Sequence, residues 1–346
     1  MTAVEAQRVR SVETVDVPCS NCGGHDDQVL YRGREHDYTT TTTDEFSVVR
    51  CARCGLARLN PRPDVTELGQ IYPPEYYAYH LVENNERAVQ RSPVARFTEA
   101  MKVRKYQSEL KHAIRVAGLQ DRPTIRLLDV GCADGRLLDW YKAGSEGSRI
   151  ETHGIDMDEA AVARARKAGH RAVVGRFEQD RELEDGTFDL ILAGHVIEHV
   201  DDPVAFAQRA ADLLAPGGLF VPATPNIDSW DARRFGRFWG GNHFPRHWTL
   251  YDAASITALM DKVGLEVVGV VYEANPVFWV WSFHSWLRNR FPKAAWPDRL
   301  FPTIGIFHAG PVSFVLLSIF TIVDLVQKRV TGKTASMAVY SRKPRV

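Results

Sequence analysis

The spacing of apolar residues predicts two kinds of regular structure between about residues 94 and 275. Short continuous apolar runs are typical of buried strands, and apolar residues recurring every three to four positions are typical of helices. The pattern predicts a leading helix at 94–116, strands at 124–130, 150–156, 172–174, 188–193 and 218–223, helices at 135–143, 158–168 and 202–214, and later strands at 265–272 and 335–341. Strands that alternate with helices predict an α/β fold with a largely parallel sheet.

The first strand of this series leads into a glycine-bent loop. The strand holds Asp129 near its end, and Gly131 and Gly135 follow before a helical pattern begins. Glycine has no Cβ and adopts positive φ readily, so backbone in this loop can approach a ligand closely. The spacing Asp-x-Gly-x-x-x-Gly differs from the dinucleotide-binding Gly-x-Gly-x-x-Gly, which argues against a pyrophosphate ligand. The second strand ends in Asp156, a carboxylate that could bind both hydroxyls of a ribose.

Two further segments have a recognisable pattern. Residues 188–200 read Phe-Asp-Leu-Ile-Leu-Ala-Gly-His-Val-Ile-Glu-His-Val and precede a proline-led helix at Asp202-Pro203. Residues 214–220 read Leu-Ala-Pro-Gly-Gly-Leu-Phe, in which the glycines are expected to stop a helix before the fifth strand. With the two acid-ended strands, these segments resemble the class I S-adenosylmethionine-dependent methyltransferases. The resemblance implies a Rossmann-like, seven-stranded sheet with helices on both faces and S-adenosylmethionine as cofactor.

The same resemblance implies which residues bind the methyl donor. Asp129 and Asp134 would meet its amino group or the waters around it, Asp156 its ribose, and Met157 and Phe177 its adenine. Phe177 lies in Gly-Arg-Phe-Glu, which departs from the commoner Gly-Asp-Ala pattern of the family. Cys132 is expected to be a small apolar filler and not a nucleophile. The full expected set is Asp129, Gly131, Asp134, Gly135, Asp156, Met157, Phe177, Gly194 and His195.

Four histidines are candidates for catalysis. Methyl transfer is an in-line displacement in which the protein chiefly positions donor and acceptor, but a hydroxyl acceptor also needs a base. Histidine titrates near neutral pH and suits that task. His195 and His199 follow the fourth strand, and His243 and His247 lie in a glycine- and aromatic-rich segment at 235–251. Alternatively, each of these histidines has a structural role and only forms hydrogen bonds with nearby backbone groups.

Two Cys-x-x-Cys-Gly knuckles, Cys19/Cys22 and Cys51/Cys54, lie near the N-terminus. Four thiolates in two knuckles complete a tetrahedral site, and a closed site of this kind is structural. The sequence therefore predicts a zinc-ribbon-like module with structural zinc. The alternatives are a redox pair or reduced thiols, with His25 or His36 as less favoured substitute ligands.

The balance of charged residues argues against some classes of binding partner. The 346 residues carry 43 Lys and Arg against 43 Asp and Glu. Residues 1–72 contain eight arginines, no lysine and eleven acidic residues, which is no electrostatic footprint for phosphate, so nucleic acid is disfavoured as a partner. The N-terminus lacks the pattern of a secretory signal, which favours a cytoplasmic protein.

The C-terminal part departs from the family, in which a short link joins the last two strands. Here about sixty residues intervene. They include a tryptophan-rich run at 277–287 followed by Arg288, Arg290 and Lys293, and a second apolar run at 312–323 ended by Asp324. The second run is shorter than the about twenty residues of a membrane span. We expect an apolar helical insertion that contacts the inner face of the cell membrane peripherally. Alternatively, it covers the substrate pocket or forms a dimer contact.

The sequence thus predicts a zinc-ribbon-like module at 1–72, a linker at 73–93, a methyltransferase core at 94–275, the insertion at 276–333, and a last strand and tail at 334–346. The chain resembles bacterial methyltransferases of sugar, cell-envelope and secondary-metabolite pathways and ubiquinone-type O-methyltransferases. That implies O-methylation of a sugar, glycan, lipid-linked or secondary-metabolite acceptor. A zinc-bearing ribosomal-RNA base methyltransferase, a sugar C-methyltransferase and a non-enzymatic assembly factor stay open, as do the acceptor and the oligomeric state.

Overall fold

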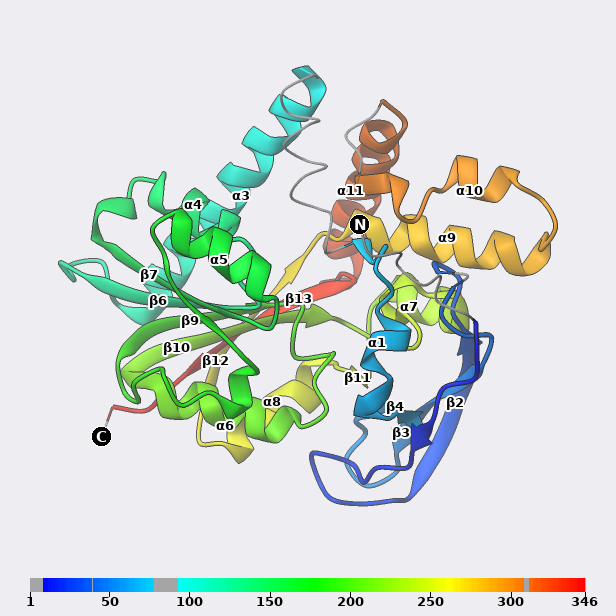
Figure 1. Ribbon diagram of the computed structural model, residues 1–346, viewed down its shortest axis with the longest axis horizontal. Helices are drawn as coiled ribbons and strands as arrows, with labels where there is room; N and C mark the ends of the chain where they lie inside the picture. Colours follow the sequence, from blue (N-terminus) through cyan, green and yellow to red (C-terminus); the bar gives the residue numbers. More distant parts are fainter. Residues whose placement is uncertain (1–8, 39, 78–92, 308–310, 346) are drawn as a thin grey trace, which may run out of the picture. The chain divides into compact units, whose positions relative to one another are not determined.

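The computed structural model describes residues 9–38, 40–77, 93–307 and 311–345. By its internal contacts the chain forms two compact units, each built from segments distant in sequence (Figure 1). The sheet unit comprises Phe97–Thr224, Ala253–Val271 and Met337–Val346. The ribbon unit comprises Met1–Arg96, Pro225–Asp252 and Tyr272–Ser336. Most of the expected linker at 73–93 lies outside the described residues.

The sheet unit is organised around one large sheet. Within the described residues this sheet has seven strands in the order β12-β13-β10-β9-β6-β7-β8. Adjacent strands from β10 to β8 pair in parallel, so the carboxyl ends of β6, β7, β9 and β10 share one edge. The strands are β6 (Ile125–Val130), β7 (Ile150–Asp156), β8 (Arg171–Val174), β9 (Phe188–Gly194), β10 (Leu214–Pro225), β12 (Glu266–Glu273) and β13 (Ser336–Arg342).

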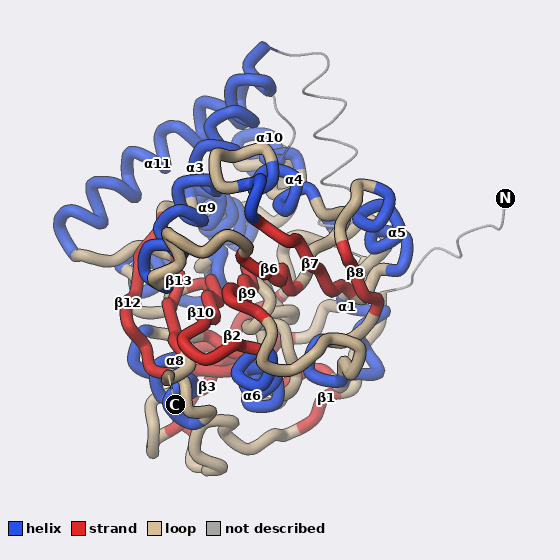
Figure 2. The backbone as a smooth tube through the Cα atoms, turned by 90° about the vertical axis from the view of Figure 1, so that its left-hand side faces the viewer, coloured by secondary structure: helices blue, strands red, loops and turns tan. Residues whose placement is uncertain are grey.

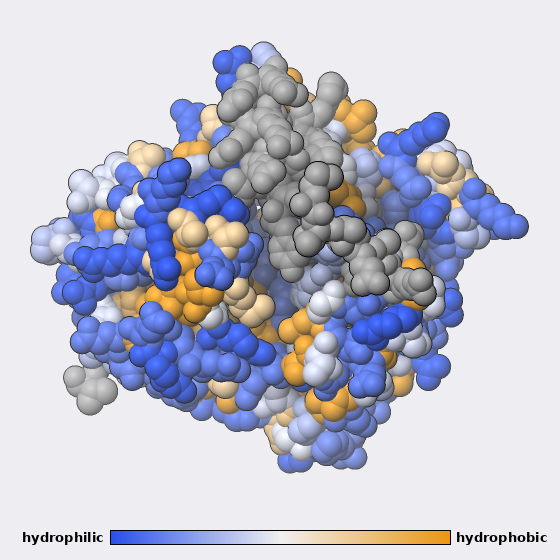
Figure 3. Space-filling view, viewed as in Figure 1, coloured by the Kyte–Doolittle hydropathy of each residue, from blue (hydrophilic) through white to orange (hydrophobic). Residues whose placement is uncertain are grey.

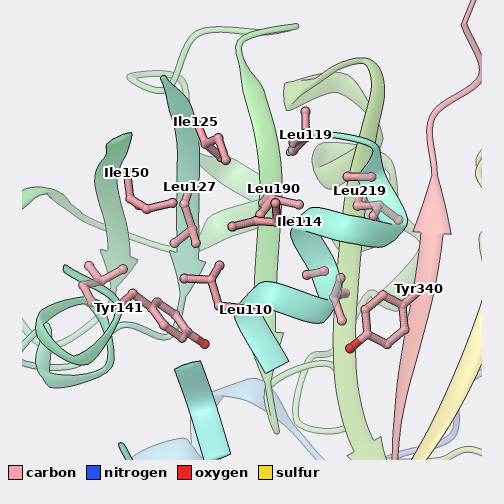
Figure 4. Packing of buried hydrophobic residues seen from close by; sticks show 14 of the residues in the cluster. Leu110, Ile114, Leu119, Ile125, Leu127, Tyr141, Ile150, Leu190, Leu219 and Tyr340 are labelled. Atoms are coloured by element: carbon pink, nitrogen blue, oxygen red, sulfur yellow. The ribbon is translucent and has the colours of Figure 1, made fainter. Parts of the chain in front are cut away.

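Helices cover both faces of this sheet. The helices are α3 (Pro93–Ala117), α4 (Arg136–Lys142), α5 (Glu159–Lys167), α6 (Pro203–Leu213) and α8 (Ala253–Lys262). The first three lie along one face, and α6 and α8 lie along the other (Figures 1 and 2). Residues of α3 pack onto apolar side chains of β6, β9 and β10, and Tyr340 of β13 closes one side of the cluster (Figure 4). The Rossmann-like fold expected from the sequence is therefore confirmed.

Local sequence explains where two helices begin. The side chain of Asp158 accepts hydrogen bonds from the amides of Ala160 (2.9 Å) and Ala161 (3.1 Å) at the start of α5. Asp202 does the same for Val204 and Ala205 at the start of α6, where Pro203 takes the first helical position. Both are ordinary N-caps, which satisfy amides that lack a partner within the helix.

The expectation that glycines end α6 is wrong. The helix ends at Leu213, and β10 begins directly at Leu214, opposite Phe188. Gly217, with φ of 82°, lies in an irregular stretch of β10 between the pairs Leu214–Phe188 and Leu219–Leu190. The glycines therefore serve a bulge in the strand, a position that favours glycine as readily as a helix end does.

The ribbon unit contains a small sheet in the order β11-β4-β3-β2. Its strands are β2 (Asp27–Arg34), β3 (Glu45–Cys51), β4 (Ala57–Leu59) and β11 (Thr249–Leu250), and a separate pair joins β1 (Thr14–Val15) to β5 (Arg62–Pro63). Its helices are α1 (Leu68–Ile71), α7 (Trp230–Phe235), α9 (Pro276–Arg290), α10 (Trp296–Leu300) and α11 (Pro311–Thr331). Segments 276–290, 296–300 and 311–331 confirm that the insertion is helical.

Asp324, which ends the apolar run at 312–323, lies within α11. Its carboxylate is buried and accepts hydrogen bonds from the indole of Trp279 and the amide of Asn275, both at 2.8 Å. Burial raises the pKa of Asp324 to about 6. These hydrogen bonds satisfy a polar group on the inner side of α11, which runs on to Thr331.

No single helix among the described residues is long and apolar enough to cross a bilayer. The segments Trp296–Phe307 and Val312–Thr331 together have the necessary length and apolar composition, but they meet at an angle of 89°. The face of the molecule seen in Figure 3 is mostly hydrophilic, with smaller apolar areas between the polar side chains.

Candidate functional site

The loop after β6 is held against the end of β7 by backbone hydrogen bonds. The amides of Gly131 and Cys132 donate to the carbonyl oxygen of Ile155 at 2.8 and 3.2 Å. Gly131 has φ of 77° and Gly135 φ of 82°. A Cβ on Gly131 would lie 2.9 Å from Val196, and one on Gly135 would lie 2.6 Å from the His170 ring. Both positions therefore need glycine, for conformation and for space.

Asp156, the last residue of β7, connects the strand to this loop. One oxygen of its carboxylate accepts a hydrogen bond from the amide of Ala133 (2.8 Å) and the other from the amide of Asp158 (2.9 Å). Ala133 has φ of 46°, in the left-handed region, which turns its amide toward Asp156. A carboxylate offers about four acceptor positions, so two acceptor positions remain for ligand hydroxyls.

Asp129 lies inside this edge of the sheet. Its carboxyl group is buried, and burial together with the nearby charge of Asp156 raises its pKa to about 7. A buried acid that titrates near neutral pH is typical of a functional site. A cationic ligand group placed beside it would favour the ionised form.

The other expected donor-binding residues occupy different surroundings. Met157 is 63% exposed, directly after Asp156. The carboxylate of Asp134 accepts a hydrogen bond from the amide of Arg136 (3.3 Å) at the start of α4. Phe177 is buried, and its ring packs edge-on against Phe206 of α6 at 4.9 Å. The structure thus gives Phe177 a packing contact, and its contact with adenine stays a prediction.

A histidine and a glutamate form a pair just beyond β9. Gly194 ends the strand on the surface, and His195 follows with φ of 56°. The His195 Nδ1 lies 3.1 Å from Oε1 of Glu198, a fully buried side chain. If the carboxylate accepts from Nδ1–H, the neutral ring carries its lone pair on Nε2. Glu198 was not predicted as a site residue, although its spacing of three residues from His195 places both on one side of a helical turn. His199 lies one residue further along, where its amide donates to the carbonyl of Val196 (3.0 Å).

His243 and His247 lie in the ribbon unit, where both side chains are buried. The ring of His243 stacks on Trp281 (5.1 Å, 15°), and its Nδ1 lies 3.4 Å from Asp37. His247 Nδ1 lies 2.7 Å from the carbonyl oxygen of Gly241. Because a carbonyl can only accept, Nδ1 carries the proton, and a neutral ring then holds its lone pair on Nε2. This tautomer can accept a proton.

A buried arginine organises the surroundings of these histidines. Arg246 pairs with Glu35 at 2.5 Å and donates to the carbonyl of Ile71 at 2.7 Å. Its guanidinium lies over the rings of Tyr38 (4.6 Å) and Tyr76 (5.6 Å). Removing either charge of such a buried pair would leave the other charge uncompensated. The contacts of Arg246 therefore hold the 243–248 segment in place.

The four cysteines of the ribbon unit come together as the knuckle pattern predicts. Sγ of Cys19 lies 3.4 Å from that of Cys54, Sγ of Cys22 lies 3.5 Å from that of Cys51, and all four lie within 4.8 Å of one another. Four sulfurs at about 2.3 Å from a tetrahedral zinc ion would be about 3.8 Å apart. Partial burial raises the pKa of Cys51, but hydrogen bonds from the amides of Cys54 and Arg53 outweigh it and lower that pKa to about 7. The donor set fits a zinc ion.

Known proteins resemble parts of this chain. A family model described as a methyltransferase domain matches residues 103–270. A ubiquinone biosynthesis O-methyltransferase of Cereibacter sphaeroides is 30% identical over 174 residues, which is 46% of this chain and 68% of that protein. One from Caulobacter is 36% identical over 106 residues, or 30% of this chain.

The extent of these matches varies. The chain covers 41% of the Caulobacter protein and 46% of a Bradyrhizobium protein of the same name, less than half of each. Among solved structures, a Haemonchus contortus phosphoethanolamine N-methyltransferase 2 in complex with S-adenosyl-L-methionine is 18% identical, with a TM-score of 0.43 over 70% of this chain and 52% of that one.

Proposed function

The chain belongs to the S-adenosylmethionine-dependent methyltransferases, and we propose that it transfers the donor's methyl group to a hydroxyl oxygen of a small molecule. The donor supplies a methyl group on a positively charged sulfur. The protein's part is to hold the donor, orient the acceptor, exclude water and remove a proton.

The observation that best supports donor binding is the Asp156 carboxylate. It lies at the carboxyl edge of a parallel sheet, where ligands of open α/β folds bind, and it is fixed by the Ala133 and Asp158 amides. We infer that its remaining acceptor positions hold the two ribose hydroxyls. Calorimetric titration of the purified chain with S-adenosylmethionine tests this directly. One donor bound per chain is expected, and a folded protein that gives no binding heat would contradict the proposal.

The raised pKa of Asp129 predicts that folding and donor binding both change the protonation of this carboxyl group. Its pKa of about 7 in the folded protein exceeds the roughly 3.9 of an exposed aspartate, so the folded state binds the extra proton and loses stability as pH rises from about 4 to 7. The donor's ammonium group beside it would favour ionisation. We therefore expect donor binding at pH 7 to release up to about half a proton.

Calorimetry in two buffers of different ionisation enthalpy measures this release. The binding heat should differ between the buffers for the natural protein, and Asp129→Asn should abolish the difference. Equal heats in both buffers for the natural protein would show that Asp129 does not titrate on binding.

Histidines are the proposed bases, with His199 and His247 first and His195 and His243 as further candidates. Replacing His199 or His247 by Ala should lower turnover by about 10²- to 10⁴-fold, the usual contribution of a general base. The donor dissociation constant should change little. His112→Gln on α3 is the control, because it removes an imidazole that is not a candidate base and should leave turnover nearly unchanged. If both alanine variants keep nearly full turnover, positioning alone must suffice.

We further propose that Cys19, Cys22, Cys51 and Cys54 bind one structural zinc ion. The sulfur separations and the hydrogen bonds to Cys51 support this assignment. With four protein ligands the ion would have no open position for substrate, so its contribution is to the folding of the ribbon unit.

The acceptor class is the least constrained part of the proposal. The names of the matching relatives refer to ubiquinone biosynthesis, which favours O-methylation of an amphipathic small molecule over C-methylation of a sugar. A glycan, lipid-linked or secondary-metabolite hydroxyl fits equally. The acidic balance of residues 1–72 disfavours ribosomal RNA. An assembly factor without activity is disfavoured because Asp129 and Asp156 are both in place. We propose a cytoplasmic location.

A further inference from the structure

The outer face of α11 is apolar although it is exposed. Its large apolar side chains are 38% to 78% exposed. These residues, called the α11 face below, are Val312, Phe314, Val315, Ile319, Ile322, Leu325, Val326 and Val330. Among the described residues from Val312 to Val326, no exposed position of α11 carries a charge. Contiguous exposed apolar surface of this kind marks an interaction site.

The opposite face of α11 is packed inside the ribbon unit. Phe320 stacks on Trp279 of α9 (5.8 Å, 2°), and Asp324 accepts the hydrogen bond of the same indole. The side-chain amide of Gln327 donates to the buried Asp231 (3.0 Å). Since polar groups and protein contacts occupy this inner side, lipid could surround only the outer side of α11. The helix can lie on a membrane in this arrangement, but it cannot be wholly immersed.

The width of the α11 face favours a lipid surface over a partner helix as the occupant. Val312, Val315, Ile319, Ile322 and Val326 follow the three- and four-residue spacing of a coiled-coil seam. Such a seam is narrow and is flanked by charged positions that select the partner. Here the flanking positions include Phe314 and Leu325, so the face covers roughly half of the helix circumference. A broad uncharged face is typical of a helix lying in a membrane interface.

The segment that contains α11 carries a positive net charge. Residues 276–333 contain seven Lys or Arg and two Asp, whereas the whole chain is balanced. Of the two acids, Asp324 is buried and Asp298 lies 3.5 Å from Arg288. Lys328 and Arg329 are exposed in the last turn of α11. In the α9–α10 region, Trp286, Phe291 and Trp296 are more than 40% exposed among further basic residues, a composition found at membrane interfaces.

We propose that the α11 face binds peripherally to an anionic lipid surface, with its apolar side chains in the acyl boundary and the surrounding Lys and Arg near the headgroups. The positive charge of segment 276–333 and the broad uncharged apolar surface of the α11 face both complement such a surface. The proposal does not depend on the proposed reaction, although it places the enzyme where an amphipathic acceptor would be concentrated.

Co-sedimentation of the full, zinc-loaded chain with vesicles tests the proposal. The protein should sediment with vesicles containing phosphatidylglycerol and bind phosphatidylcholine vesicles at least about tenfold more weakly. The double variant Ile322→Glu/Val326→Glu should bind anionic vesicles at least about tenfold more weakly than the natural protein. Both residues are about 60% exposed, so folding should not suffer. Met101→Glu places a carboxylate at an apolar position of α3 that is 52% exposed; this control should bind as the natural protein does.

Two outcomes would overturn the proposal. The first is a natural protein that stays in the supernatant with anionic vesicles, or a double variant that sediments as well as the control. The second is a dimer, seen by light scattering, that the double variant dissociates without any vesicle binding, because the occupant would then be a second copy. Donor binding by the double variant should be unchanged, so failure here is distinguishable from failure of the proposed reaction.

Discussion

Asp156→Asn should weaken S-adenosylmethionine binding by about 30- to 150-fold, or about 2–3 kcal/mol. The substitution keeps the size of the side chain and one carbonyl oxygen, but it removes the charge and one acceptor. Hydrogen bonds to charged acceptors are stronger than those to neutral ones, so the ribose hydroxyls should lose most of their binding energy. Calorimetric titration with the donor at pH 8 measures this loss of affinity. At that pH Asp129, with its pKa of about 7, is largely ionised in both proteins.

Asp158→Ala provides the matched control. Asp158 is an acid only two residues away, but its carboxylate caps α5. Its loss should cost about 1 kcal/mol of folding stability and leave donor affinity within about twofold. If Asp156→Asn bound the donor as tightly as the natural protein, or if both variants weakened it equally, Asp156 would not be the ribose ligand.

The purified protein should contain about one zinc per chain, and Cys51→Ser should lose both the metal and the fold of the ribbon unit. Structural zinc contributes about 10–16 kcal/mol of apparent binding free energy in small zinc-dependent peptides, which is comparable to the whole stability of a typical domain, about 5–15 kcal/mol. Removing one of four ligands should therefore unfold β2, β3 and β4 near the knuckles. Elemental analysis and amide hydrogen exchange measure the two effects.

Cys132→Ala controls for the loss of a thiol. Cys132 is buried in the sheet unit and belongs to the core cluster with Leu127 and Leu138. This variant should keep its zinc and lose only a modest amount of stability. A folded, unoxidised natural protein without near-stoichiometric zinc would rule out the metal site.

The sheet unit could be predicted because its signals are local. Apolar runs such as Ile125–Val130 are buried strands, and Asp158 and Asp202 are caps that act within three residues. Each of these effects depends on neighbours in sequence, so a linear pattern records it. Each cysteine knuckle is also a local pattern. The assembly of the two knuckles, with Cys19 and Cys54 35 residues apart, was predictable because four thiolates complete one tetrahedral metal site.

Features that depend on distant segments could not be read in advance. Strand β11 has two residues and exists because Thr249 and Leu250 pair with Arg58 and Ala57. The buried carboxylate of Asp324 accepts a hydrogen bond from an indole 45 residues earlier. The buried Arg246 pairs with a glutamate from the N-terminal part, so its sequence neighbours gave no sign of it. Glu198, by contrast, lies only three residues from His195, so its pairing with that histidine could have been predicted from the sequence.

The central claim is methyl transfer to a small-molecule hydroxyl, and one measurement tests it most directly. The zinc-loaded chain is incubated with methyl-labelled S-adenosylmethionine and fractionated cell extract. Label should enter the small-molecule or lipid fraction as a base-stable ether, with one S-adenosylhomocysteine formed per methyl group, and Asp156→Asn should abolish the signal at low donor concentration. Label found in RNA, or no transfer to any fraction by a chain that binds the donor, would contradict the account.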